Sequence, residues 1–195
     1  MLLHGIRVSA PAQVFLEMAA LVNLVELVVI GDALVRQERV SPEQLMAAAA
    51  AYRGRGAVLA RRAAAFVRRD VDSPMETRLR MLIVLAGLPE PQVNFTIRHS
   101  DGRVRYRLDL SYPELTLAIE YDGRQHADDP LQWRGDTERD GWFDRAHWLK
   151  IKVLSTGIYR EPEQTLLRVR AAIKERGGRV PRRLRDDWRP FFPVG

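Results

Sequence analysis

The fold of this chain is decided by Leu115-Thr116-Leu117-Ala118-Ile119-Glu120-Tyr121-Asp122-Gly123. The first five residues are almost wholly apolar and a glycine ends the stretch, which is typical of a central strand buried on both faces. This strand passes directly into two acids, and buried carboxylates are costly unless a cation neutralises them. We therefore expect a buried strand over Leu115–Tyr121 that carries a charged site at its end.

Two further strands are predicted before this one and another after it. Apolar residues at every second position indicate the two upstream strands, and Ser100-Asp101-Gly102 between them is a hairpin signal. The three additional strands are predicted over Val93–Ile97, Val104–Leu108 and Leu149–Leu154.

Helices are predicted around these strands. A capping box at Ser73–Glu76 opens the first helix, which ends at Gly87. A charged helix is expected over Asp136–His147 and a closing helix over Pro162–Arg176. The resulting order, αβββαβα, predicts an α/β fold.

The segments before and after this core differ from it in residue pattern and composition. Residues 1–72 show only helical periodicity, so we expect an all-helical segment whose helices cover Pro11–Arg36, the alanines after Ser41, and Val58–Arg69. Residues 177–195 are rich in Arg, Pro and Trp and lack periodicity. We expect a tail that either wraps the domain through Trp188, Phe191 and Phe192 or becomes ordered on a partner. The predicted domains are 1–72, 73–176 and 177–195.

Charge is distributed unevenly. Arg168–Arg189 holds nine basic and three acidic residues, which equals the whole net charge of +6. Asp109–Asp144 holds ten acids and three arginines, a net of −7. A basic balance points weakly to nucleic acid as a partner. The acidic stretch contains the charged end of the strand Leu115–Tyr121. The excess negative and the excess positive charge therefore lie in different parts of the chain.

Composition excludes several classes of protein. The chain has no cysteine, which removes disulfide scaffolds, thiolate zinc sites and cysteine nucleophiles. Polar and charged residues interrupt the apolar stretch Val14–Val35, so it is not a membrane span. The first residues do not have the layout of a signal peptide. We therefore expect a cytoplasmic protein without a membrane partner.

Three acids and a histidine are predicted to gather at the strand ends. Asp109 and Glu120 lie on either side of the Tyr112–Pro113 turn, and antiparallel pairing would place them side by side, although a one-residue slip in register would change the face. Asp122 shares a face with Glu120, and His126 follows. Such an oxygen-rich site suits Mg²⁺ or Mn²⁺. The alternative is a hairpin end whose charges point to water.

These residues carry a resemblance to a known family. The runs Ser73–Leu79, Arg107–Leu110 and Ile119–Gly123, with His126, resemble the PD-(D/E)XK nuclease superfamily. Within it they are most similar to the very-short-patch-repair endonucleases and their uncharacterised actinobacterial relatives. The resemblance covers about residues 73–175. It implies a restriction-endonuclease-like αβββαβ core with a mixed sheet, a bound Mg²⁺ or Mn²⁺, and hydrolysis of DNA.

The resemblance also implies roles for individual residues. Asp109 and Glu120 would bind the metal, and Tyr121 would offer its backbone carbonyl as a further ligand. Glu76 would help to hold metal or water. The capping box by itself also accounts for a glutamate at position 76, so both explanations stay open.

Asp122 departs from the family pattern, which places a lysine there. His126 is our candidate general base or water-orienting group, since a neutral imidazole can accept the proton of an attacking water. A surface histidine after a turn is the alternative. Lys150 and Lys152 on the next strand could instead supply the missing cation, and without any substitute the site would be weak or inactive.

The predicted function is a metal-dependent DNA endonuclease or nickase. Its substrate would be double-stranded DNA, with or without a mismatch or other structure. Arg124, Arg134, Arg182 and Arg183 would hold the phosphate backbone, and Trp133 would stack on a splayed base. A homodimer would bring together the two sites that double-strand cleavage needs.

The alternative is a non-enzymatic DNA-binding regulator on a nuclease-derived fold. Val8–Pro11 and Gly31–Leu34 resemble the helical part of antitoxin-like regulators of the abortive-infection type. In such regulators a winged-helix DNA reader often precedes this part, so either this protein is shorter or its start lies upstream. A third hypothesis is a scaffold that binds a protein partner through residues 1–72.

Overall fold

The computed structural model describes residues 2–3, 6–123 and 130–192, with side chains described for 8–123 and 138–192. The chain divides into two compact units, Met1–Arg78 and Leu79–Gly195. The boundary falls inside helix α5 (Pro74–Leu85), whereas the sequence predicted a change of domain at Ser73. The basic tail belongs to the second unit.

The first unit is built mainly of short helices. They are α1 (Pro11–Met18), α2 (Leu24–Arg36), α3 (Pro42–Ala51), α4 (Ala57–Ala64) and the first residues of α5. The predicted helical stretch over Pro11–Arg36 is two helices, because the Asn23 side chain accepts a hydrogen bond from the Glu26 N–H at 3.0 Å and starts α2. Two-residue strands β1 (Leu2–Leu3) and β2 (Ile6–Arg7) pair before α1. The prediction of an all-helical segment was therefore wrong in this detail.

A buried carboxylate joins the helices of the first unit. Asp32 is 2% exposed and accepts hydrogen bonds at 2.8 Å from the Arg68 backbone N–H and the Thr77 hydroxyl. The bond to the Arg68 N–H helps to explain why α4 ends at Ala64 rather than continuing to Arg69 as predicted. Asp32 thus stabilises the packing of this unit.

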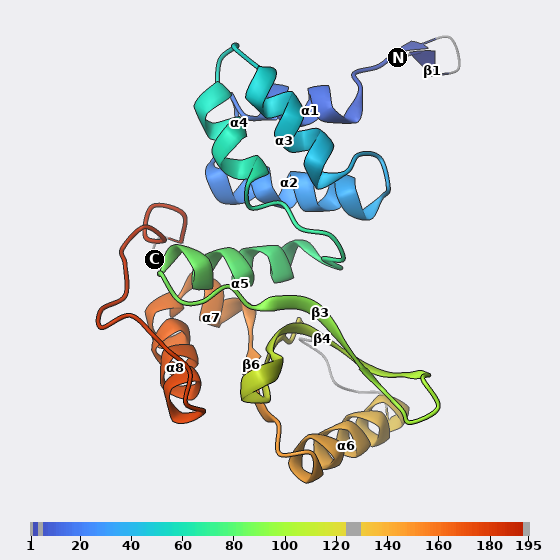
Figure 1. The fold of residues 1–195 in the computed structure, drawn as a ribbon, viewed down its shortest axis with the longest axis vertical. Coiled ribbons are helices and arrows are strands. Elements are labelled where there is room, and N and C mark those ends of the chain that lie inside the picture. The colour runs from blue at the N-terminus through green and yellow to red at the C-terminus, as the bar shows by residue number, and fades with distance from the viewer. Residues whose placement is uncertain (1, 4–5, 124–129, 193–195) are drawn as a thin grey trace. The chain divides into compact units, whose positions relative to one another are not determined.

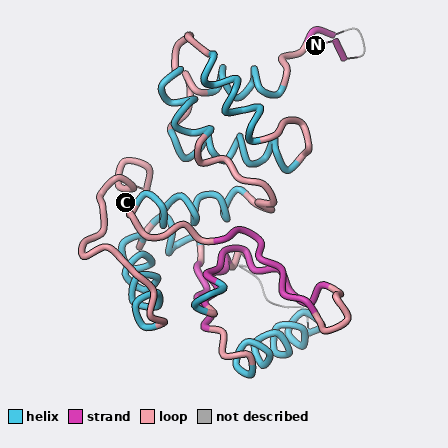
Figure 2. Tube along the Cα trace, in the orientation of Figure 1, coloured by secondary structure: helices cyan, strands magenta, loops and turns pink. Residues whose placement is uncertain are grey.

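The second unit contains a four-stranded sheet with the order β3-β4-β5-β6, drawn in magenta in Figure 2. Its strands are β3 (Gln92–Arg98), β4 (Val104–Tyr112), β5 (Leu117–Tyr121) and β6 (Leu149–Val153). Neighbouring strands are antiparallel except β5 and β6, which are parallel. The predicted α/β class and mixed sheet are confirmed at this level.

Strand β5 lies between β4 and β6, and its Leu117, Ala118 and Ile119 are fully buried, as predicted. The strand begins later than predicted because Pro113–Leu115 form a 3₁₀ turn (η1) and Thr116 has a positive φ of 46°. Strand β4 runs on to Tyr112 instead of ending at Leu108. Asp109 therefore lies within a strand rather than near its end.

Helix α6 (Pro130–Arg145) lies beside the sheet (Figure 1). Its Phe143 packs against residues of the sheet. The helix begins earlier than the predicted Asp136 and ends before His147. Phe143 is buried with Leu108 and Ala118, and half-buried aromatic side chains surround this cluster: Phe95, Tyr106, Trp142 and Trp148. The charged helix is therefore held by a short apolar face.

Two more helices follow β6. Helix α7 (Ser155–Tyr159) was not predicted, because five residues are too few to show a helical period. Helix α8 (Pro162–Glu175) contacts β5 and β6 and matches the predicted closing helix to within one residue. Within the described ranges, no helix combines the length and apolar character that a membrane crossing requires.

The basic tail folds back on the second unit. Trp188 and Phe192 are each 1% exposed, and the Arg185 N–H donates to the Ala86 carbonyl at 2.9 Å. Phe191 is only half-buried. Of the two predicted arrangements, the structure has the tail wrapped on its own domain.

Candidate functional site

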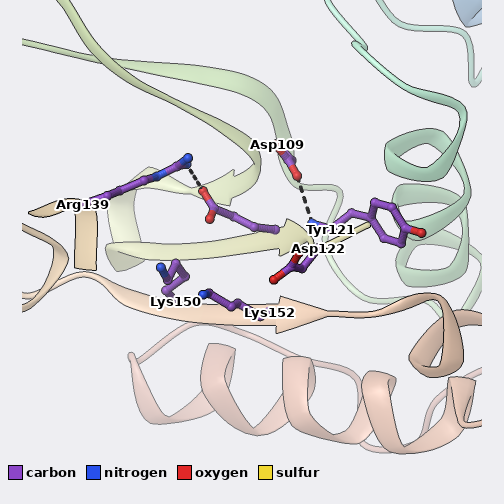
Figure 3. Close-up of a pocket in the computed structure, with 7 residues that line it drawn as sticks. Asp109, Tyr121, Asp122, Arg139, Lys150 and Lys152 are labelled. Atoms are coloured by element: carbon purple, nitrogen blue, oxygen red, sulfur yellow. Dashed lines mark hydrogen bonds and ion pairs between the residues drawn. The ribbon is translucent and has the colours of Figure 1, made fainter. Parts of the chain in front are cut away.

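A cavity of about 140 Å³ lies at the carboxyl end of β5 (Figure 3). Charged residues line it from β4, β5, α6 and β6. They are Asp109, Glu120, Asp122, Arg139, Lys150 and Lys152, and Tyr121 completes the lining. The structure therefore brings together the predicted acids and the two lysines considered as substitutes for the missing cation.

The parallel pairing of β5 with β6 positions the lysines. Lys150 pairs with Ala118, and Lys152 pairs with Glu120. Side chains two residues apart share a face of a strand, so both lysines lie on the face of Glu120. The intervening Ile151 is 6% exposed, which fits the alternation of a strand with one face in the core.

Asp109 is held against the backbone of β5. The regular pairing of β4 with β5 extends to Leu110 and Ile119, and beyond it the Tyr121 N–H donates to Asp109 Oδ2 at 2.9 Å. The Asp122 N–H donates to the Val153 carbonyl at 2.9 Å. These bonds hold the middle of β4 and the ends of β5 and β6 together around the cavity.

Glu120 forms a partly buried ion pair with Arg139 of α6. The Glu120 side chain is 12% exposed and that of Arg139 is 27% exposed. Arg139 Nη2 donates to Glu120 Oε1 and also to the Arg107 carbonyl at 3.1 Å. Burial raises the pKa of Glu120, against the opposing charges of Arg139, Lys150 and Lys152.

Lys150 and Lys152 differ in their partners. Lys150 Nζ donates to Asp140 Oδ1 and lies 5.0 Å from the centre of the Phe143 ring. Burial acts to raise the pKa of Asp140, but the hydrogen bond and charge of Lys150 outweigh it, so this pKa is lowered. The Lys152 ammonium makes no hydrogen bond or ion pair with any residue that the structure describes. Lys152 is also exposed, so a ligand that enters the cavity can reach its ammonium.

Among the described residues, the acids that line the cavity face cations of the protein itself. Three carboxylates, those of Asp109, Glu120 and Asp122, face three cations, those of Arg139, Lys150 and Lys152. The sequence indicated that a cation must offset the acids at the end of β5. In the folded chain, side chains from α6 and β6 provide this compensation.

The oxygen atoms that line the cavity are of the chemical type that binds a hard divalent cation. Three carboxylates and the Tyr121 carbonyl are the oxygen ligands that Mg²⁺ and Mn²⁺ prefer. Across the described parts of the chain, however, no three Asp, Glu or His side chains are close enough together to hold a metal ion. Glu120 Oε1 already accepts a hydrogen bond from Arg139 Nη2.

Glu76 is explained by local structure. Its N–H donates to Ser73 Oγ at 3.2 Å, and its Oε2 accepts from the Asp72 N–H at 3.0 Å. It belongs to the first unit, and it is not among the residues that line the cavity. These hydrogen bonds at the start of α5 agree with the capping-box explanation, and the catalytic role of Glu76 stays a prediction.

Several predicted residues lie beyond what the structure describes. Arg124 and His126 are outside the described residues, and Trp133 and Arg134 lie in α6 with side chains that are not described. Arg182 and Arg183 are exposed and line a second cavity, of about 240 Å³, between α8 and the tail.

Sequence reasoning did not find Arg139. A signal was present, because Arg139 lies four residues before the buried Phe143 and so shares the helix face that meets the sheet. Its guanidinium lies 5.5 Å from the Tyr106 ring centre and 5.8 Å from that of Phe143. Asp140, which was not expected in the site, contributes by holding Lys150.

The raised pKa of Glu120 predicts a pH-dependent effect of Glu120→Gln on stability. The folded chain binds this proton more tightly than the unfolded chain, so ionisation of Glu120 costs folding free energy once the pH rises through its ordinary value of 4.5. The variant lacks this cost. Urea unfolding between about pH 4 and about pH 7 should show its free energy of unfolding rising relative to wild type. A difference that stays constant or falls would contradict the prediction.

Comparison with known proteins gives relatives of unassigned activity. No family model matches the chain, and no solved structure matches it. Two uncharacterised proteins of Mycobacterium tuberculosis, from strains CDC 1551 and H37Rv, are each 28% identical to it over 162 residues. The match covers 83% of this chain and 59% of each relative, so the chain spans about three fifths of the length of the curated relatives it matches.

Proposed function

We propose that the second unit is a PD-(D/E)XK-type nuclease domain that hydrolyses phosphodiester bonds in DNA with Mg²⁺ or Mn²⁺. The observation that carries this proposal is the pairing of Glu120 with Lys152 in a cavity that also contains Asp109. The resemblance calls for two acids and a lysine, and here the lysine comes from β6 instead of from position 122. The order α5-β3-β4-β5-α6-β6 and the mixed sheet are compatible with the restriction-endonuclease-like core.

The residues of the cavity have distinct proposed roles. Asp109, Glu120 and the Tyr121 carbonyl would hold the ion, which when bound would lower the pKa of a water and stabilise charge on the scissile phosphate. The Lys152 ammonium would stabilise the same developing charge from β6. Asp140 would keep Lys150 in place beside it. His126 stays a prediction for the group that accepts the proton of the attacking water.

Arg182 and Arg183 are proposed to hold the DNA backbone. Arg170 donates to the Pro181 carbonyl at 3.2 Å and to the Arg182 carbonyl at 2.8 Å, which fastens this segment to α8. The Arg182 and Arg183 side chains are exposed on this fastened backbone. Phosphate binding by a preordered surface loses less conformational entropy than binding by a free tail.

Purified protein should nick supercoiled plasmid with Mg²⁺ or Mn²⁺ and lose this activity in EDTA. Asp109→Ala should lower the nicking rate by about 10²–10³-fold, because it removes a proposed metal ligand. Asp101→Ala is the matched control, since Asp101 lies in the exposed turn between β3 and β4 and should not affect nicking. Equal nicking by wild type and Asp109→Ala would refute the proposed site.

A non-enzymatic DNA-binding regulator is the second candidate. It is favoured by the two ion pairs, Arg139 with Glu120 and Lys150 with Asp140, which compensate acids at the site without a metal. Salt-dependent DNA binding without turnover in Mg²⁺ or Mn²⁺ would support this candidate over the nuclease.

A further inference from the structure

We propose that Arg139 is a positioning residue that opposes divalent metal binding. It holds the Glu120 carboxylate in an ion pair until a substrate phosphate binds the Arg139 guanidinium in place of Glu120. This inference rests on the proposed nuclease function. It concerns which partner Glu120 has before and after the substrate enters the cavity.

The contacts of Arg139 hold Glu120 in its present position. Arg139 Nη2 donates to both Glu120 and the Arg107 carbonyl, and the guanidinium lies over the Tyr106 and Phe143 rings. The Glu120 side chain is largely buried, so this pair is weakly screened by water. A metal ion that uses Glu120 must therefore compete with a charged hydrogen bond.

The Arg139 guanidinium is also incompletely hydrogen-bonded in its present position. Its Nε is buried and makes no hydrogen bond within the part of the chain that the structure describes. The side chain lines the same cavity as Lys152, so a phosphate that enters the cavity would meet both cations. A guanidinium binds phosphate through two parallel N–H bonds, which offers Arg139 a partner in place of Glu120.

The charges around the cavity favour the exchange of Glu120 for a phosphate as the partner of Arg139 once a metal ion is bound. Among the described residues, the three lining carboxylates and Asp140, which holds Lys150, outnumber the three lining cations by one, so a divalent ion alone would leave an excess of one positive charge. A phosphodiester brings a negative charge that offsets this excess and draws Arg139 away from Glu120. Metal and phosphate should therefore each strengthen the binding of the other.

The test is Mn²⁺ binding measured by calorimetry on the full chain without DNA. Arg139→Gln should bind Mn²⁺ about tenfold more tightly than wild type, since Glu120 is then released from its charged partner. Arg145→Gln removes the same charge from an exposed position on α6 and should leave Mn²⁺ affinity unchanged. In a Glu120→Gln background, Arg139→Gln should have no further effect, which separates this role from general charge repulsion.

A measurement on the wild-type protein does not depend on the folding of any variant. A short phosphorothioate duplex, which resists cleavage, should tighten Mn²⁺ binding to the wild type, and Mn²⁺ should tighten duplex binding by the same factor. The proposal is overturned if Arg139→Gln binds Mn²⁺ no better than wild type, or if the duplex leaves Mn²⁺ affinity unchanged.

Plasmid nicking measured on the same samples separates this inference from the proposed function. If the wild type nicks plasmid but Arg139→Gln does not bind Mn²⁺ more tightly, the nuclease proposal is supported and the proposed role of Arg139 is overturned. Tighter Mn²⁺ binding by Arg139→Gln without nicking by any sample would support the competition for Glu120 and overturn the nuclease.

Discussion

Lys152→Ala is expected to lower Mg²⁺-dependent nicking by about 10²–10³-fold, the usual cost of removing one charge-stabilising group from an active site. Lys152 lies opposite Glu120 in the parallel pairing of β5 with β6, and its ammonium makes no hydrogen bond or close ion pair with any described residue. Of the three cations that line the cavity, it is therefore the best placed to meet a phosphate. Single-turnover nicking of supercoiled plasmid measures the effect.

Two other lysines make this test specific. Lys174→Ala removes an exposed lysine of α8 that does not line the cavity and should not affect nicking. Lys150→Ala should have a smaller effect than Lys152→Ala, because Asp140 already holds the Lys150 ammonium. Nicking at the wild-type rate by Lys152→Ala would show that another group, with His126 the first to examine, supplies the missing function.

Trp188→Ala is expected to lower the free energy of unfolding by about 3–5 kcal/mol, as is typical when a large buried aromatic side chain is removed. Trp188 is 1% exposed and is the largest of the fully buried side chains among the residues that the structure describes. The Arg189 guanidinium lies 4.6 Å from its ring centre, and the variant removes this cation–π interaction as well. Urea unfolding measures the loss. Phe191→Ala should cost much less because Phe191 is only half-buried.

The same variant tests whether the tail holds DNA. Without Trp188 the segment that carries Arg182 and Arg183 loses its largest apolar anchor in the second unit, and only weaker contacts such as the Arg170 hydrogen bonds still hold it. Duplex affinity should fall, and the slope of log affinity against log salt should become shallower by about 0.9 for each phosphate that the protein no longer neutralises. Mn²⁺ affinity should not change, because Trp188 does not line the cavity of Asp109. An unchanged salt slope would show that these arginines do not bind phosphate.

Parts of the fold with strong local patterns could be predicted from the sequence. The apolar run before Glu120 indicated the buried central strand, and the Ser41 capping box indicated the start of α3. Elements without such a pattern could not be predicted: α7 is too short to show a period, and β5 starts late because of the turn at Thr116. Backbone turns of this kind depend on how the chain packs as well as on local residue preference.

The candidate site was predictable in its acids and less so in its cations. Asp109, Glu120 and Asp122 follow one another around a single turn, so their proximity is a local property of β4 and β5. The partners of these acids come from later in the chain. Arg139 and Lys152 reach the cavity only because α6 packs on the sheet and β6 returns parallel to β5.

The sequence by itself determined that this chain forms an α/β domain with an acidic site at the end of a buried strand, because hydrophobic period and strand geometry are local. Only the tertiary structure decided what neutralises that site. The sequence suggested a metal for the acids of the −7 stretch, and the structure shows three protein cations there as well. Which cation meets which carboxylate depends on strand register and helix packing, and these are set by contacts between residues far apart in the chain.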